Sequence, residues 1–249
     1  MSLSYLRSIL ITDPLIVLAT IIMGTVSMIA SLFDKTGRTQ HSVARGWARM
    51  LLAVSGVKVE ISGAEKLDLE APYVLAANHQ SLMDTPLIIA HVPLEFRFFA
   101  KEGLFHIPFL GTHLRRAGHF PVVRGNARAS LKVLTDAARV IRERRLSVLL
   151  FPEGGRSPLG MRAFKEGAAH LAIKAEVPLV PVGIRGTREV LPMGSFHIRP
   201  QTVRLRIGDP IPTVGLTPHD RGALSRQVEQ QVAELSDQSP APAAVSEPM

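Results

Sequence analysis

The sequence contains no cysteine and few aromatic residues, and these two shortages exclude several kinds of chemistry. Without cysteine, the 249-residue chain has no disulfide, no thiolate nucleophile and no cysteine-ligated metal site. Aromatic residues make up 5% of the chain, with one tryptophan, so stacking surfaces for single-stranded nucleic acid are poorly supplied. The sequence also carries no recognition motif for nucleic acid. We therefore expect no nucleic-acid partner.

Two common enzyme motifs are missing as well. The chain has no Gly-x-x-x-x-Gly-Lys-Ser/Thr sequence, so a Walker-type nucleotide site is not indicated. The serine-hydrolase sequence Gly-x-Ser-x-Gly fails at its last position in residues 155–159. The nine histidines are scattered and show no metal-ligand spacing. We expect neither a metal nor a bound cofactor.

Basic and hydrophobic residues, in contrast, are abundant. The chain has 29 Lys plus Arg against 21 Asp plus Glu, which gives a formal net charge of +8. Such a balance favours a polyanion, either nucleic acid or anionic lipid headgroups. Hydrophobic residues make up 46% of the sequence, which is high for a soluble protein and directs attention to a membrane segment. The length fits one domain with an appendage.

The appendage is an uncharged stretch, residues 14–33, between Asp13 and Asp34. About twenty residues is the length that a helix needs to cross a bilayer. A cleaved signal peptide fits less well, since residues 27–29 are a poor cleavage site. A helix or helical pair lying in the membrane interface also fits, because residues 5–11 extend the apolar character upstream. A buried core helix is a further alternative.

The charges that flank this stretch indicate its orientation. Arg7 precedes it, whereas four basic residues follow it: Lys35, Arg38, Arg45 and Arg49. The positive-inside bias therefore places the main domain on the cytoplasmic side of the cell (inner) membrane. We assign residues 1–54 to membrane attachment, with 40–54 as a connecting amphipathic helix.

Apolar strand-like runs alternate with helical patterns along the rest of the chain. The predicted strands are 57–61, 73–77, 97–100, 119–123, 147–151, 179–184 and 202–207, and the predicted helices are 85–91, 126–144, 164–175 and 216–235. This alternation predicts an α/β fold with a mostly parallel, mixed sheet flanked by helices. Pro181 marks its strand as an edge or a bulge. The domain spans 55–235, and residues 236–249 read as a disordered tail.

A histidine and an aspartate lie between the predicted strand 73–77 and the next helix. His79 and Asp84 are five residues apart, so they meet only if the loop folds the chain back. Asp84 would then accept from one ring nitrogen and leave the other as a base, with no nucleophile in the motif itself. Alternatively, Asp84 caps the helix that contains Pro86, and Asn78 only turns the chain.

Further polar residues follow other predicted strands. Lys101, Arg124 and the pair Glu153 and Arg156 all stand at or after strand ends. The carboxyl ends of parallel strands share one edge of the sheet, so these residues are expected to line one crevice. Arginine binds phosphate through two parallel hydrogen bonds, and residues 154–155, both glycine, would let backbone N–H groups approach an anion. The alternative for each arginine is a surface ion pair with Glu153 or another acid.

Four motifs in order resemble those of the lysophospholipid/glycerol-phosphate acyltransferase family. They are Asn78-His79-x4-Asp84, Gly118-x-Phe120-x3-Arg124, Phe151-Pro-Glu-Gly-Gly-Arg-Ser157 and Val177-Pro-Leu-Val-Pro-Val182. The likeness covers roughly residues 55–210 and is closest to the bacterial 1-acyl-glycerol-3-phosphate acyltransferases, which have an N-terminal membrane-bound helical segment. Gly155 departs from the family, which usually has threonine there, so no role is carried over to that position.

The resemblance implies a reaction. His79 would take the proton from the free sn-2 hydroxyl of lysophosphatidic acid, while Asp84 holds the imidazole. The hydroxyl oxygen would then attack the thioester of acyl-CoA or acyl carrier protein directly, giving phosphatidic acid without a serine or cysteine nucleophile. The residues implied for the glycerol-phosphate headgroup are Arg124, Glu153, Gly154 and Arg156, with Lys101 and Lys165 as further phosphate ligands.

Two alternatives to this function remain open from the residues. In the first, the enzyme acylates another lysolipid acceptor, such as lyso-ornithine lipid or a lysophospholipid with a larger headgroup. The chain would otherwise be a non-catalytic membrane protein that binds anionic lipid, as its charge of +8 favours.

Overall fold

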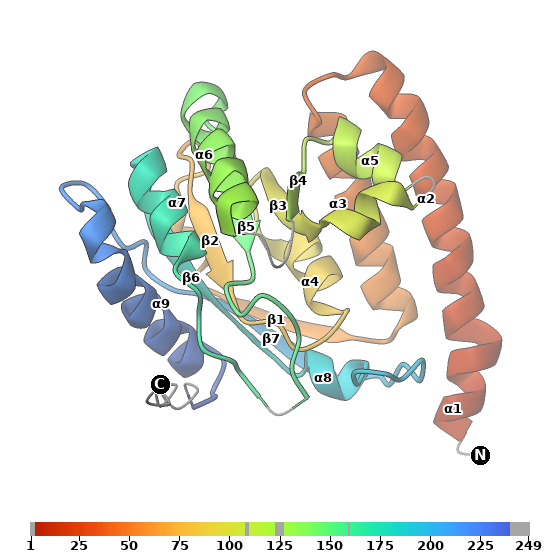
Figure 1. The fold of residues 1–249 in the computed structure, drawn as a ribbon. Helices are drawn as coiled ribbons and strands as arrows, with labels where there is room; N and C mark the ends of the chain where they lie inside the picture. The colour runs from red at the N-terminus through yellow and green to blue at the C-terminus, as the bar shows by residue number, and fades with distance from the viewer. Residues whose placement is uncertain (1–2, 108–109, 123–126, 159, 240–249) are drawn as a thin grey trace.

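A mixed β-sheet forms the centre of the structure, a computed structural model that describes residues 3–107, 110–122, 127–158 and 160–239 (Figure 1). Within these residues the sheet has seven strands, in the order β1 (Lys58–Ser62), β7 (Thr202–Ile207), β6 (Leu179–Arg185), β2 (Val74–Ala77), β5 (Ser147–Leu150), β3 (Phe96–Lys101) and β4 (Phe120–Val122). All neighbours are parallel except β6 and β7, which are antiparallel. The predicted α/β fold with a mostly parallel, mixed sheet is confirmed.

Helices cover both faces of this sheet (Figure 1). One face packs against α3 (Arg38–Val54) and α4 (Asp84–His91), and the other against α6 (Ala127–Arg144), α7 (Gly167–Ala175) and α9 (Arg221–Leu235). The shorter elements are η2 (Ala64–Lys66), η3 (Glu102–His106), α5 (Leu110–Arg116), α8 (Thr187–Val190) and η4 (Pro218–Asp220). Because α3 packs into the same core as α4, the residues assigned to membrane attachment include a helix of the folded body.

Strand β2 shows why an apolar run without polar alternation becomes a central strand. Leu75 and Ala77 pack with the α3–α4 side, whereas Val74 and Ala76 pack with the α6–α7–α9 side. All four side chains are fully buried, since helices cover both faces. Such strands are read from sequence as short continuous apolar runs.

The prediction that Pro181 marks an edge strand is wrong, because β6 lies in the interior between β7 and β2. The alternative, a bulge, is confirmed: from Pro181 to Leu179 the strand advances by two residues, whereas its partner advances by three, from 208 to 211. The carbonyl of Pro181 faces β7 and accepts the N–H of Gly208 at 2.9 Å. The regular pairing with β7 ends at Ile207, one residue before Gly208, and resumes between Leu179 and Ile211, so the proline without an N–H lies at this bulge. Gly208 leaves room for the ring, since a Cβ there would lie 2.6 Å from Pro181 Cγ.

The N-terminal segment is one long helix that runs along the outside of α3 (Figure 1). It comprises α1 (Leu3–Arg7), a π-helical turn η1 (Ser8–Thr12) and α2 (Asp13–Phe33). Residues 4–33 are long and apolar enough to cross a membrane by length and composition. One side is attached to the body, through Trp47 Nε1–H to Thr20 Oγ1 at 3.0 Å and a 2.7 Å contact of Ser27 Oγ with His113 Nδ1. The opposite side is exposed and apolar.

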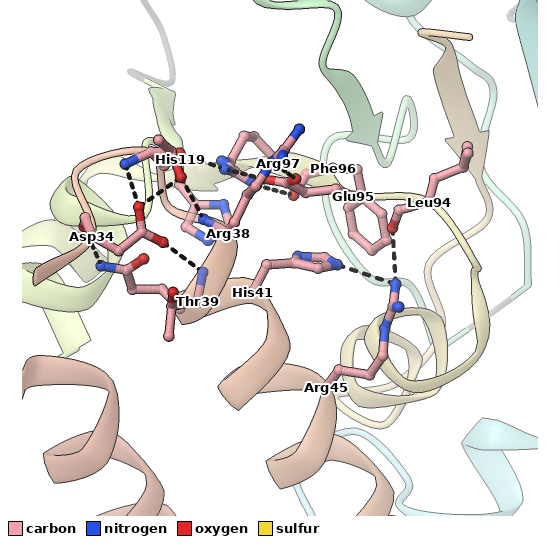
Figure 2. Close-up of polar contacts among 12 residues, drawn as sticks. Asp34, Arg38, Thr39, His41, Arg45, Leu94, Glu95, Phe96, Arg97 and His119 are labelled. Atoms are coloured by element: carbon pink, nitrogen blue, oxygen red, sulfur yellow. Dashed lines mark hydrogen bonds and ion pairs between the residues drawn. The ribbon is translucent and has the colours of Figure 1, made fainter. Parts of the chain in front are cut away.

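A buried polar cluster joins the start of α3 to β3, as Figure 2 shows. The Arg97 side chain is 2% exposed and donates to Glu95 at 2.6 Å and to the carbonyl of Thr36 at 3.0 Å. Arg45 donates to the carbonyls of Val92 and Leu94 just beyond α4, each at 2.9 Å. Cationic side chains stabilise the carbonyl end of a helix, so these contacts fix α3 against both α4 and the sheet.

His41 lies inside this cluster and is held neutral. Burial, together with the charges of Arg45 and Arg97, lowers its pKa to about 3. The pKa values of His113 and His119 are lowered by burial too, and for His119 the lowering is large. Neutral imidazoles can pack beside guanidinium groups, whereas protonated ones would add buried positive charge.

The predicted helix and tail boundaries shift in several places. The helix predicted at 164–175 begins at Gly167, and the helix predicted from 216 begins at Arg221 after η4. The tail boundary at 236 is too early, because Ser236 is fully buried and Asp237 pairs with Arg206 at 2.8 Å. Residues 240–249 lie outside the described residues.

We predict that the neutral state of His41 makes the fold sensitive to acid. The unfolded chain takes up the proton near the ordinary pKa of 6.5, whereas the folded chain does so only near 3, so stability falls as pH drops between these values. At pH 4.5 the loss from His41 is about 2–3 kcal/mol, from about 1.4 kcal/mol per pKa unit. Urea unfolding in mild detergent from pH 7 to 4.5 measures it.

The matched variants are His41→Gln, which should flatten the acid slope, and His219→Gln, which changes an exposed histidine and should leave it unchanged. Parallel slopes for His41→Gln and the unaltered protein would contradict the prediction.

Candidate active site

The segment Asn78–Asp84 connects β2 to α4 and is attached to the sheet at its first residue. Asn78 Nδ2 donates to the carbonyl of Ile184 at 2.9 Å, and the N–H of Ile184 donates to Asn78 Oδ1 at 2.7 Å. The amide side chain thus continues the pairing of β2 with β6 beyond Ala77. Ser81 fixes the middle of the loop, because its hydroxyl donates to the carbonyl of Leu191 at 2.8 Å.

The loop folds the chain back, so that His79 and Asp84 meet as the spacing allowed. His79 Nδ1 lies 2.8 Å from Asp84 Oδ2, and the same oxygen accepts the N–H groups of Gln80 at 2.6 Å and Ser81 at 2.9 Å. Asp84 is fully buried and is the first residue of α4. Neither oxygen accepts an N–H of α4 among the described residues, so the alternative in which Asp84 caps α4 is wrong.

This contact determines which nitrogen of His79 is free to react. A carboxylate only accepts hydrogen bonds, so Nδ1 carries the hydrogen and Nε2 keeps its lone pair. The ring stacks on Phe151, with centroids 4.0 Å apart and planes 17° from parallel. The His79 side chain is still 17% exposed. An oriented imidazole with one accessible basic nitrogen is the arrangement that general-base catalysis requires.

Glu153 holds the backbone of His79. Its side chain is 2% exposed, and its two oxygens accept the N–H of His79 at 2.6 Å and the N–H of Arg162 at 2.8 Å. Burial raises the pKa of the carboxyl above its usual value of 4.5, although these donors partly lower it. Each oxygen accepts one backbone N–H, so the structure gives Glu153 a role in positioning His79. A contact of Glu153 with substrate stays a prediction.

The loop that carries Glu153 also brings cationic groups together. Gly154 has φ +73°, and a Cβ at this residue would lie 3.0 Å from Lys165 Nζ, so the lysine lies directly over the glycine turn. The N–H of Lys165 donates to the carbonyl of Pro152 at 3.0 Å. Arg156 is half-buried and forms no hydrogen bond or ion pair with the described residues. The alternative in which Arg156 pairs with Glu153 is therefore wrong.

The remaining predicted phosphate ligands lie further from the dyad or outside the described part. Lys101 is exposed and ends β3, two strands away from β2. Arg124 lies outside the described residues, and β4, the strand before it, is the next strand beyond β3. A role for either residue stays a prediction.

Two residues of this site were missed by sequence reasoning. Thr187 is 1% exposed, and its hydroxyl donates to Asp84 Oδ1 from the start of α8. Arg188 donates to the carbonyl of Ser157 at 3.0 Å and so holds the Glu153 loop. Thr187 is 103 positions from Asp84, and nothing in the local pattern of either residue signals the contact.

Comparison with known proteins agrees with this geometry. A family model described as Acyltransferase matches residues 58–185, which hold the dyad and the Glu153 loop. A curated 1-acyl-sn-glycerol-3-phosphate acyltransferase from Saccharomyces cerevisiae is 30% identical over 237 residues, covering 92% of this chain and 76% of the relative. The chain belongs to the acyltransferase family.

A plant relative and a solved structure of the same family also match this chain. A 1-acyl-sn-glycerol-3-phosphate acyltransferase from Limnanthes alba is 33% identical over 66% of this chain, and the chain spans 58% of that relative's length. The crystal structure of the 1-acyl-sn-glycerophosphate (LPA) acyltransferase PlsC from Thermotoga maritima matches with a TM-score of 0.78 and 26% identity. That match covers 94% of this chain and 97% of the other. The expected special closeness to bacterial members stays a prediction.

We predict that Glu153→Gln destabilises the fold. The amide would turn an NH₂ group toward one of the two backbone N–H donors, leaving that donor unmatched at a cost of about 1–3 kcal/mol in unfolding free energy. Glu166→Gln is the control, since the Glu166 carboxylate forms an exposed ion pair with Arg221, and its loss should change the unfolding free energy by less than about 1 kcal/mol. Chemical denaturation in detergent gives both values.

The contribution of Glu153 to the free energy of unfolding depends on pH with a definite sign. The folded-state pKa of Glu153 is raised, so its contribution to stability is full below the ordinary pKa of 4.5 and is lost as pH rises through the raised value. The stability gap between the unaltered protein and Glu153→Gln should therefore narrow with rising pH. A gap that widens would contradict this assignment.

Proposed function

We propose that this protein transfers a fatty acyl group from a thioester to the free sn-2 hydroxyl of lysophosphatidic acid, producing phosphatidic acid. The single observation that carries the proposal is the His79–Asp84 contact at 2.8 Å, which leaves a basic nitrogen at the carboxyl edge of the sheet. The names of the relatives supply the substrate class: 1-acyl-sn-glycerol-3-phosphate acyltransferases from plant and yeast, and an LPA acyltransferase of solved structure.

In the proposed mechanism, His79 Nε2 removes the proton of the acceptor hydroxyl as that oxygen attacks the thioester carbonyl carbon. The resulting imidazolium is stabilised by the Asp84 carboxylate through Nδ1–H. When the tetrahedral intermediate collapses, the C–S bond breaks, and the imidazolium returns its proton to the leaving sulfur. The products are the new ester and a free thiol, and His79 ends neutral.

The substrate's own hydroxyl is the nucleophile in this scheme. Ser81, the one hydroxyl residue between His79 and Asp84, is fully buried and donates to the carbonyl of Leu191. The chain has no cysteine. Direct transfer without a covalent acyl-enzyme therefore fits these residues, and either acyl-CoA or acyl carrier protein serves as donor.

The phosphate of the acceptor is proposed to lie on the Glu153 loop. Arg156 has no competing partner among the described residues, and Lys165 lies over the backbone turn at Gly154. Guanidinium, ammonium and exposed backbone N–H groups together suit a phosphate dianion. Lys101 and Arg124 would add further positive charge along the same edge.

Membrane attachment is proposed through the N-terminal helix, with the domain on the cytoplasmic side of the inner membrane. Polar contacts tie this helix to the body along its length, from Ser8 near one end to Ser31, which accepts from Arg116 at 2.6 Å, near the other. A helix attached in this way presents its free apolar side, with Leu18 and Ile21 more than half exposed, as a strip along the domain. We infer that it lies in the membrane interface instead of crossing the bilayer.

We predict that His79→Ala abolishes acyl transfer. Removing a general base lowers turnover by about 10³-fold. The assay follows free thiol released from acyl-CoA by detergent-purified protein, with and without lysophosphatidic acid, while circular dichroism checks that the fold is kept. His219→Ala, at an exposed position, is the control and should keep full activity.

Undiminished turnover in His79→Ala would refute the mechanism. Preference for a phosphate-free lysolipid would show a different acceptor class, and vesicle binding without any thiol release would show a lipid-binding protein.

We predict that Thr187→Val raises the pH at which activity is lost on the acid side. Without the Thr187 hydroxyl, the buried Oδ1 of Asp84 loses its only donor among the described residues, so the dyad holds a proton more tightly. The acid limb of kcat/KM should move to higher pH, and kcat/KM at pH 7 should fall about tenfold, roughly the value of one hydrogen bond to a charged group.

Thr187→Ser should restore both quantities. The control is Thr213→Val, a buried threonine that donates to the carbonyl of Val177 away from the dyad. A pH profile identical to that of the unaltered protein in Thr187→Val would mean that Thr187 only supports packing.

A further inference from the structure

The segment between α8 and β7 exposes apolar side chains on a loop. Phe196 is 87% exposed and Met193 is 45% exposed. Nothing lies within 4 Å of the position that a Cβ on Gly194 would take, so the tip of the loop projects into open space. Exposed aromatic side chains that cluster with other apolar residues mark interaction surfaces. Residues 192–199 are called the tip loop below.

The tip loop is attached to the beginning of the N-terminal helix. Ser8 is fully buried there; its Oγ accepts the N–H of Ile198 at 2.8 Å and donates to the carbonyl of Phe196 at 3.3 Å. The ring of Tyr5 meets His197 edge to face, with centroids 5.3 Å apart. Figure 1 shows this segment extending from α8 to α1. Phe196 is therefore held beside the helix that carries the exposed apolar strip.

The other end of the same segment reaches the dyad. Thr187, at the start of α8, donates to Asp84, and the carbonyl of Leu191, which directly precedes the tip loop, accepts from Ser81. A short stretch of chain thus contacts the His79–Asp84 loop at one end and the N-terminal helix at the other. The apolar tip is therefore linked both to the dyad loop and to the helix proposed to contact the membrane.

Cationic residues flank the exposed apolar groups. Arg199 is exposed at the end of the tip loop, and Arg7 on α1 is half-buried and donates to the carbonyl of Ser55 at 3.3 Å. Apolar side chains beside arginines match the boundary between acyl chains and anionic headgroups. This complementarity favours a bilayer over a second protein as the occupant.

We propose that the tip loop inserts Phe196 and Met193 into the headgroup–acyl boundary of an anionic membrane, as a second contact beside the N-terminal helix. The proposal rests on the membrane attachment proposed above. The domain would then contact the bilayer at two places, the apolar strip of the N-terminal helix and the tip loop. Two contacts fix the rotation of the domain about the helix axis, which one helix alone leaves free. That rotation turns the carboxyl edge of the sheet, with His79, toward the lipid surface.

The absence of cysteine allows a direct test, because Phe196→Cys accepts one environment-sensitive nitrobenzoxadiazole label. The matched control is Val214→Cys, at a residue equally exposed at 87% but on the loop before η4, on the opposite side of the sheet from α3. Each labelled protein is mixed with vesicles of phosphatidylcholine and phosphatidylglycerol. We expect a blue shift and brighter emission at position 196 and neither change at position 214.

Cosedimentation of the same samples separates this proposal from the attachment on which it rests. If the protein sediments with vesicles while the emission of the label at 196 stays unchanged, the proposed insertion of the tip loop is overturned and the proposed attachment through the helix is not. Protein that does not sediment overturns both. A blue shift that needs no vesicles and grows with protein concentration would show contact with a second copy of the chain, and it would also overturn the proposal.

A functional comparison uses Phe196→Glu with Val214→Glu as its control. Losing the burial of one phenylalanine should weaken vesicle binding about tenfold or more and raise KM for vesicle-borne lysophosphatidic acid to match. Activity on a short-chain lysophosphatidic acid dispersed as monomers should not change. An equal loss on both acceptors would mean that Phe196 supports the dyad through the fold, contrary to the proposal.

Discussion

The buried carboxylate of Asp84 is the constraint on which the site depends. A fully buried charge is stable only when donors surround it, and these come from three places: two backbone N–H groups of its own loop, the His79 ring, and the Thr187 hydroxyl of a distant segment. Satisfying the hydrogen bonds of this group therefore folds the loop back, selects the tautomer of His79 and ties α8 to the start of α4. The proposed catalytic geometry is a consequence of solvating one carboxylate inside a protein.

A second buried polar cluster joins the N-terminal helices to the same sheet. Arg97 and Arg45 lie among backbone carbonyls and Glu95, with His41 and His119 beside them (Figure 2). His41, His119 and the nearby His113 stay neutral, since burial lowers their pKa values. Because Ser27 on α2 contacts His113, the helix proposed to touch the membrane is coupled to the body through hydrogen bonds as well as apolar packing. The N-terminal segment is thus part of the folded structure and presents one face outward.

The success and failure of the sequence predictions have physical reasons. Central strands such as β2 and β5 were predictable because burial on both faces demands continuous short apolar runs. Pro181 correctly predicted a bulge but not an edge strand, because a missing N–H shows that regular pairing is interrupted and not which strands lie on either side. A polar residue after a strand predicts a place in a crevice, but it does not predict that the two oxygens of Glu153 accept backbone N–H groups from residues 79 and 162.

The sequence by itself determined the alternation of strands and helices, the apolar N-terminal helix, and the motif in which a histidine precedes an aspartate by five residues. These properties are local, because they follow from side-chain type and spacing along a few turns or strands. Only the tertiary structure decided that Thr187 completes the shell of Asp84, that Glu153 positions His79, and that Phe196 stands beside the N-terminal helix. Those contacts join residues 74 to 188 positions apart, and such pairings arise from the order of strands in the sheet, which no local pattern encodes.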